Sequence, residues 1–290
     1  MQSNFIKNAP HAAIILLLLV VSGEAMILFG KNATHTPTLP EYADKIFALC
    51  AQRNYPPACY DEEIPKLMDE ITMEDAFKVT RLVQEKASSY FYCHVLGHGL
   101  SARETAKAPE KWKEVITRCP SGVCSNGCIH GAFQERFRSE SFSASELSEL
   151  KGELHEICEE KENWRPTGME QATCYHALGH LSMYVTAGDI RAAIGLCKEI
   201  AVHGVRNYSQ LCYDGAFMQI FQPLEPEDFA LVEGRQPSKS GLASFCSAFG
   251  FEEKSSCWSE GWPLFREEIN TPNGLYAFCS HLQNESQRVR

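Results

Sequence analysis

Two short motifs recur in the same order along this chain, and this duplication constrains the fold more than any other feature. The first motif, Tyr92-Cys-His-Val-Leu-Gly-His98, returns as Cys174-Tyr-His-Ala-Leu-Gly-His180. The second runs from Cys128 to Phe137 (CIHGAFQERF) and returns from Cys212 to Phe221 (CYDGAFMQIF). Repeated units bury their hydrophobic faces against one another. The sequence therefore predicts a repeat protein with duplicated units at about 90–160 and 170–230.

Decayed copies extend this pattern on both sides of the two clear units. Cys257-Trp-Ser-Glu-Gly-Trp262 matches the second motif loosely, and Cys59-Tyr-Asp61 keeps part of it. Apolar residues at three- and four-residue steps, interrupted by Pro and Gly, indicate successive helices, and no alternating strand pattern occurs. We therefore expect an all-α chain with decayed repeats at 45–90 and 240–285.

The stretch Tyr175–Ile200 (YHALGHLSMYVTAGDIRAAIGLCKEI) resembles a tetratricopeptide or Sel1-like repeat. This resemblance implies stacked antiparallel helix pairs with a concave groove, which in such repeats usually serves as a binding scaffold. The implied fold is a right-handed, solenoid-like stack of helical hairpins. The small and polar positions that carry the resemblance are Leu178-Gly179, Gly188-Asp189 and Ala192-Ala193.

Thirteen cysteines, an odd number, lie mostly at the expected ends and starts of helices. Disulfides that tie the end of one helix to the start of the next resemble those of cysteine-rich Sel1-like proteins. Each such loop closure contributes roughly 3 kcal/mol of stability. The remaining cysteines are Cys93, Cys124 and Cys279. The predicted pairs are Cys50–Cys59, Cys119–Cys128, Cys158–Cys174, Cys197–Cys212 and Cys246–Cys257.

So many cysteines favour an oxidising compartment, and the N-terminus points the same way. Residues 12–29 (AAIILLLLVVSGEAMILF) form an apolar stretch just long enough to span a bilayer as a helix. A cleaved signal peptide is the alternative. The sequence predicts a signal anchor over 1–30 and an extracytoplasmic domain over 31–290, as a single-pass membrane protein.

The charge balance excludes one class of partner. The chain has 37 acidic and 27 basic residues, a net charge of −10. Nucleic-acid binding needs clustered Lys and Arg against the phosphates, so no nucleic-acid partner is expected. The partners that the sequence favours are the membrane, through the N-terminal helix, and a protein or peptide in the groove.

Each copy of the first motif carries two histidines four residues apart, which places both imidazoles on one helix face, able to share a metal ion. A further His or Asp follows each pair in the second motif, and the Asp could act as a carboxylate ligand or general base. Imidazole suits zinc, copper and iron, and the scarcity of carboxylates favours zinc or copper. The predicted ligands are His94, His98, His130, His176, His180 and Asp214.

Two other interpretations stay open. In one, the duplicated histidines only cap or hydrogen-bond neighbouring hairpins. In the other, the groove binds a peptide or glycan without any metal. Enzyme motifs do not decide between these interpretations. The zincin pattern HExxH requires Glu after the first His, but positions 95 and 177 are Val and Ala, so the pattern is absent. The sequence thus leaves the assignment of an enzymatic activity open.

Overall fold

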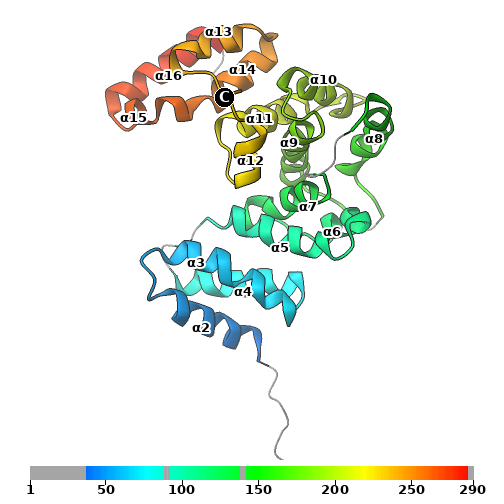
Figure 1. Ribbon diagram of the computed structural model, residues 1–290, viewed down its shortest axis with the longest axis vertical. Helices are drawn as coiled ribbons and strands as arrows, with labels where there is room; N and C mark the ends of the chain where they lie inside the picture. Colours follow the sequence, from blue (N-terminus) through cyan, green and yellow to red (C-terminus); the bar gives the residue numbers. More distant parts are fainter. Residues whose placement is uncertain (1–36, 88–89, 91, 138–141, 163, 287–290) are drawn as a thin grey trace, which may run out of the picture.

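The computed structural model describes residues 37–286, except 88–89, 91, 138–141 and 163. This part of the chain is mostly helical, with one two-stranded hairpin, which confirms the predicted helical class. The chain rises from α2–α4 through α5–α7 to α9–α11 and ends in α13–α16 (Figure 1). The finer expectation, a right-handed solenoid, stays a prediction.

The first half of the described chain forms seven α-helices, and some of them begin with a side-chain cap. The Thr38 and Glu41 side chains form a capping box at the start of α2, and the Thr72 hydroxyl accepts from the Asp75 N–H at the start of α4. Such caps satisfy backbone N–H groups that lack helical partners. The helices are α2 (Leu39–Cys50), α3 (Pro56–Glu63), α4 (Met73–Lys86), α5 (His94–Ala106), α6 (Trp112–Thr117), α7 (Gly127–Phe137) and α8 (Ala144–Ile157).

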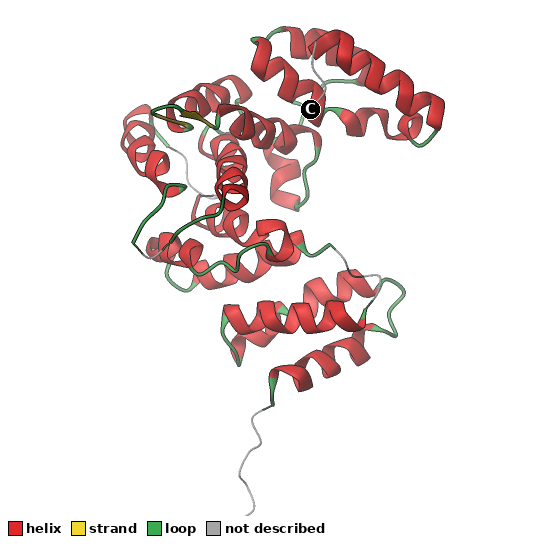
Figure 2. Ribbon diagram, turned by 180° about the vertical axis from the view of Figure 1, so that it is seen from behind, coloured by secondary structure: helices red, strands yellow, loops and turns green. Residues whose placement is uncertain are grey.

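The second half continues in the same way, with a Thr167–Glu170 capping box on α9 and the Asp189 carboxylate capping α10. Figure 2 shows the helices from behind, with the small hairpin beside them. The helices are α9 (Gly168–Val185), α10 (Ile190–Ile200), α11 (Ser209–Phe221), α12 (Pro226–Leu231), α13 (Leu242–Ser247), α14 (Phe251–Glu260), α15 (Arg266–Ile269) and α16 (Pro272–Ser286). Short 3-10 turns occupy Pro65–Asp69, Pro109–Lys111, Val123–Asn126, Lys239–Gly241 and Trp262–Phe265.

The repeated motifs create two close helix crossings, α5 over α7 and α9 over α11. A Cβ atom on Gly131 would collide with the backbone carbonyl oxygen of His98. A Cβ atom on Gly215, the equivalent residue of the second copy, would collide with the carbonyl oxygen of His176, which is one helical turn before His180, the counterpart of His98. Only glycine permits this approach of two backbones. The glycines of the motif therefore permit a close backbone contact in both units, shifted by one helical turn between them.

Six disulfides are present in the described part of the chain, and all five predicted pairs are among them. The sixth joins Cys93 to Cys124, two of the cysteines that the prediction left over. Cys279 is free and exposed. Most pairs connect helix ends as expected, but Cys174 lies well inside α9, because that helix already begins at Gly168.

The strands β1 (Val202–His203) and β2 (Arg206–Asn207) form an antiparallel hairpin that the helical pattern did not predict. Gly204 has a φ of +57°, a left-handed conformation that suits a tight hairpin turn. The paired segments are only two residues long, too short to produce a recognisable alternating pattern.

The predicted membrane localisation requires correction. In the part of the chain that the structure describes, no helix combines the length and the apolar character needed to cross a bilayer. The helix α9 has 18 residues, but Glu170, His176 and His180 interrupt its apolar positions. The predicted anchor at 1–30 lies outside the described residues. The single-pass assignment is therefore withdrawn.

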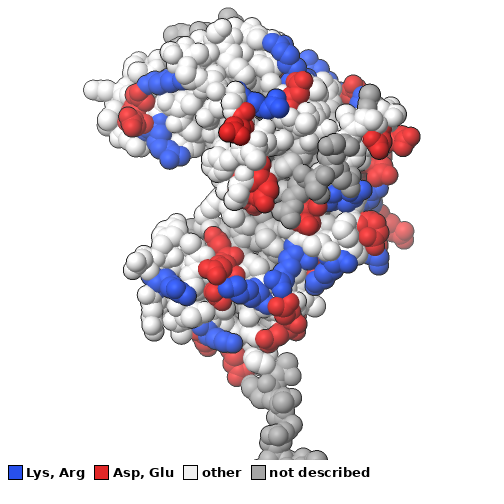
Figure 3. All heavy atoms as spheres, in the orientation of Figure 1, with Lys and Arg blue, Asp and Glu red and all other residues white. Residues whose placement is uncertain are grey.

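The buried core runs along the helix pairs, with large side chains such as Tyr60, Phe77, Phe133, Phe217 and Trp258 almost fully enclosed. On the face seen in Figure 3, acidic and basic side chains are interspersed, and the outline is indented between the lower and upper helices.

Candidate metal centre

Five of the predicted ligands meet at one place, where α5, α7 and α9 come together. The imidazole of His130, from α7, lies between the histidine pair of α5 and the histidine pair of α9. The helix crossing brings α7 against both neighbours, so one residue contacts both copies of the first motif. Its ring centroid is 4.8 Å from that of His94, 5.3 Å from His98, 5.1 Å from His180 and 5.8 Å from His176.

Three of these histidines form a compact set. The potential ligand nitrogens of His94, His98 and His130 all lie within 4.8 Å of one another. Each side chain is buried, with only 7% of its surface exposed. Zn–N bonds of about 2.0–2.1 Å place two ligand nitrogens roughly 3.3–3.4 Å apart, so binding of an ion would draw the three rings closer together. The set thus has the residue types and the proximity that a three-nitrogen metal site needs.

Oxygen acceptors orient two of the three rings of this set. The Nδ1 of His94 lies 3.3 Å from the carbonyl oxygen of Cys124, and the Nδ1 of His98 lies 3.2 Å from the Glu225 Oε1. Because neither oxygen can donate, the ring nitrogens donate. The Nε2 atoms of both rings then carry the lone pairs. Metal-ligating histidines are typically oriented in this way through their second nitrogen.

Two nitrogens of the set are buried without any hydrogen-bond partner: the Nε2 atoms of His98 and His130. A buried polar atom without a partner is destabilising by about 1–3 kcal/mol, and such atoms are rare. A metal ion or a water molecule between them would satisfy both nitrogens.

Burial keeps these imidazoles neutral. Desolvation, followed by the neighbouring histidines, lowers the pKa of His94 and of His176 to about 3. Desolvation is also the first cause that lowers the pKa of His130 and of His180. Neutral imidazole is the form that binds a metal ion, so these four residues are in the required state at neutral pH.

Two carboxylates at the start of α12 complete the surroundings. The Glu225 Oε2 accepts a hydrogen bond of 2.7 Å from Gln134, and the Asp228 carboxylate accepts one from the Tyr184 hydroxyl. Asp228 also accepts from the backbone N–H of Leu224 and of Glu225, both at 3.1 Å. The start of α12 is therefore held directly over the histidines. Neither acid was predicted from the sequence, because the prolines at 223 and 226 indicate only a helix break.

His94, His98, His130 and His180 line a narrow cavity, together with apolar side chains that include Phe133 and Leu181. Its free space is about 20 Å³, and one water molecule needs about 10–15 Å³ on this measure. The cavity can thus hold a water-sized species at the imidazoles, while a peptide is far too large for it.

Asp214, the sixth predicted ligand, takes a different place. It is buried in α11 at the position equivalent to His130. In the part of the chain that the structure describes, it belongs to neither cluster of three or more potential ligands. The structure therefore brings together five of the six predicted residues.

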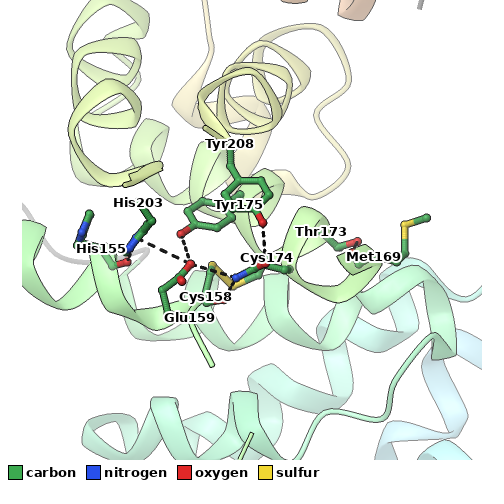
Figure 4. Close-up of a disulfide and its surroundings, with 10 residues drawn as sticks. His155, Cys158, Glu159, Met169, Thr173, Cys174, Tyr175, His203 and Tyr208 are labelled. Atoms are coloured by element: carbon green, nitrogen blue, oxygen red, sulfur yellow. Dashed lines mark hydrogen bonds and ion pairs between the residues drawn. A yellow bond between two sulfur atoms is a disulfide. The ribbon is translucent and has the colours of Figure 1, made fainter. Parts of the chain in front are cut away.

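His155, Glu156 and His203 form a second cluster, and its two histidines lie near the Cys158–Cys174 disulfide (Figure 4). The two imidazoles stack with centroids 3.7 Å apart, and the His203 Nε2 lies 2.7 Å from the carbonyl oxygen of His155. Parallel stacked rings direct their lone pairs side by side, an unfavourable arrangement for one shared ion. His155 and His203 are therefore held together by ring stacking and by this hydrogen bond.

Glu159 lies next to this second cluster and accepts hydrogen bonds from three side chains. Its carboxylate is bound by the Tyr175 hydroxyl at 2.7 Å, by the Gln171 amide at 3.0 Å and by the Arg206 guanidinium. Burial alone would raise its pKa, but Tyr175, His203 and Arg206 together hold the pKa of Glu159 below its ordinary value. The network ties α9 to the β-hairpin.

No protein-family model, curated protein or solved structure matches the chain. The expected relation to tetratricopeptide or Sel1-like repeats thus finds no support in these comparisons. The case for the site rests on its geometry.

Proposed function

We propose that this protein binds a transition-metal ion, zinc or copper, through His94, His98 and His130. The observation that carries the proposal is the convergence of three buried imidazoles whose potential ligand atoms lie within 4.8 Å. The orientation of His94 and His98 through oxygen acceptors supports it, as does the missing partner of the His98 Nε2.

Three protein ligands leave one position of a tetrahedral ion open. Structural zinc sites are usually closed by four protein ligands, whereas catalytic sites keep a position for water or substrate. A metal in this position lowers the pKa of its bound water to about 7. The chemistry that fits best is therefore metal-activated water acting on a small substrate that reaches the narrow cavity.

The stacked helical hairpins act in this proposal as a rigid, solenoid-like scaffold. The two backbone crossings at Gly131 and Gly215 support that role, since they fix the helices that carry the ligands. A groove that binds a peptide without metal has less support, because the free space at the histidines is close to that of one water molecule.

Metal analysis of the purified full-length chain tests the proposal. After incubation with Zn²⁺ or Cu²⁺ and exhaustive dialysis, we expect at least one ion per chain. His98→Gln should weaken binding by at least tenfold, since it removes a ligand. His155→Gln is the matched control, because it removes a histidine outside the five-histidine cluster. A folded wild-type chain that retains no metal would contradict the proposal.

A further inference from the structure

We propose that His176 and His180 hold a second metal ion beside the first, so that the five histidines form a two-metal centre. This inference rests on the proposed function, because it adds one further ion to the same five-histidine cluster. Nothing in the first site requires it, so the two proposals can fail separately.

The first argument is the distance between the two ring nitrogens that face each other. The Nε2 of His180 lies 3.2 Å from the Nε2 of His176. Two nitrogens bound to one tetrahedral zinc ion at about 2.0–2.1 Å lie roughly 3.3–3.4 Å apart. The pair is therefore already at the separation of two ligands of one ion.

The orientation of His180 is the second argument. Its Nδ1 lies 2.6 Å from the Gln219 Oε1. An amide oxygen accepts and does not donate, so the Nδ1 carries the proton and the Nε2 carries the lone pair. That lone pair is on the nitrogen that faces His176. Gln219 thus orients a ligand as Glu225 orients His98 in the first set.

The position of His130 is the third argument. Its ring centroid is 5.1 Å from that of His180 and 4.8 Å from that of His94. His130 therefore lies between the two sets of histidines and contacts both. Enzymes place paired metal ions about 3.5–4 Å apart.

The charge around the five-histidine cluster is the fourth argument. Two divalent ions repel each other strongly where water is largely excluded. The Asp228 carboxylate lines the cavity, and Glu225 contacts His98 at its edge. These acids offset part of the added positive charge, which imidazole ligands alone would not do.

A simple hydrogen bond is the competing explanation, with one proton shared between the two Nε2 atoms. A metal titration distinguishes the two cases. The full-length chain is stripped with a chelator, titrated with Zn²⁺ alone and analysed for bound ions per chain. We expect two ions for the wild type, one for His180→Gln and one for His98→Gln, with two for the control His155→Gln.

Other outcomes separate the two proposals. One ion that is lost in His98→Gln and kept in His180→Gln overturns the second site and leaves the first intact. One ion that is lost in both variants also overturns the second site, since a single ion is then shared. No ion in the folded wild type overturns both.

Because His180→Gln could disturb folding, Gln219→Ala serves as a second variant. It should weaken the affinity for the second ion only, by about 10–100-fold. An unchanged affinity for the second ion would contradict the assignment.

Discussion

The rings of Tyr175 and Tyr208 stack face to face, with centroids 4.5 Å apart and planes at 13° (Figure 4). Tyr175 occupies the position in the second copy of the first motif that Cys93 occupies in the first copy. Tyr208 stands four residues before Cys212, as Cys124 stands four residues before Cys128. The aromatic stack thus replaces the Cys93–Cys124 disulfide of the first unit.

Removing the stack should destabilise the second unit. Tyr208→Ala loses the ring contact with Tyr175 and the hydrogen bond of 2.7 Å to Gln171, and we expect the free energy of unfolding to fall by about 2–4 kcal/mol. Tyr208→Phe keeps the stack and loses only the hydrogen bond, so about 1 kcal/mol is expected. Urea denaturation measures both. Equal losses in the two variants would show that the stack contributes nothing.

We expect the crossing of α9 and α11 at Gly215 to tolerate no side chain. Gly215→Ala places a methyl group against the carbonyl oxygen of His176, and we expect a loss of about 3 kcal/mol in unfolding free energy. Gly195→Ala in α10 is the matched control, because its Cβ meets no atom within 4 Å. It should raise stability by about 0.5–1 kcal/mol through higher helix propensity. Thermal unfolding of both variants checks the opposite signs.

Glu225 should tune metal affinity without being a ligand. Glu225→Gln weakens the acceptor that orients His98, and we expect zinc affinity to fall by about tenfold or more. Glu233→Gln removes the same charge from an exposed position nearby and should leave the affinity within about twofold of wild type. Competition with a chromophoric chelator measures both values. An equal fall in both variants would indicate a general charge effect instead of orientation of His98.

The Glu159 network should make stability depend on pH. Because the pKa of Glu159 is lowered in the folded state, its stabilising contribution is complete above its ordinary, unfolded-state pKa. The contribution is lost as the pH falls through the lowered folded-state value. We expect Glu159→Gln to lose about 1–3 kcal/mol at pH 7, with a smaller difference from wild type at pH 3. Denaturation at several pH values checks this, and a constant difference would contradict it.

The disulfide pattern leaves one thiol to react. Titration of the unreduced, denatured chain with a thiol reagent should find one thiol, on Cys279, and none in Cys279→Ser. Two additional thiols in both proteins would show that one of the six disulfides is not formed.

The duplication allowed much of this structure to be predicted. Cysteines near helix ends gave the five predicted disulfides, because neighbouring helix ends are close both in sequence and in space. The Cys93–Cys124 bond was missed since the second copy holds Tyr175 in place of Cys93, and the repeat therefore offered no second example. The shared spacing of the motifs likewise grouped five histidines correctly.

The remaining parts of the site depend on contacts between distant segments. Glu225 is separated from His98 by 127 residues, and neither local spacing nor the repeat indicates that the start of α12 lies over α5. Asp214 was predicted as a ligand by its equivalence to His130. The equivalence holds in sequence, but α7 is the helix that lies between the two histidine pairs, and α11 is not.

This last asymmetry distinguishes what each of the two repeated units contributes to the histidine cluster. Two identical halves would each be expected to carry their own histidine cluster, but here one five-histidine cluster forms where the halves meet, with His130 contributed by the first of them. The first half alone holds His94, His98 and His130, but the five-histidine cluster also needs His176 and His180 of the second half. The larger cluster is thus a property of the two units together, whereas the proposed three-histidine site lies within the first unit.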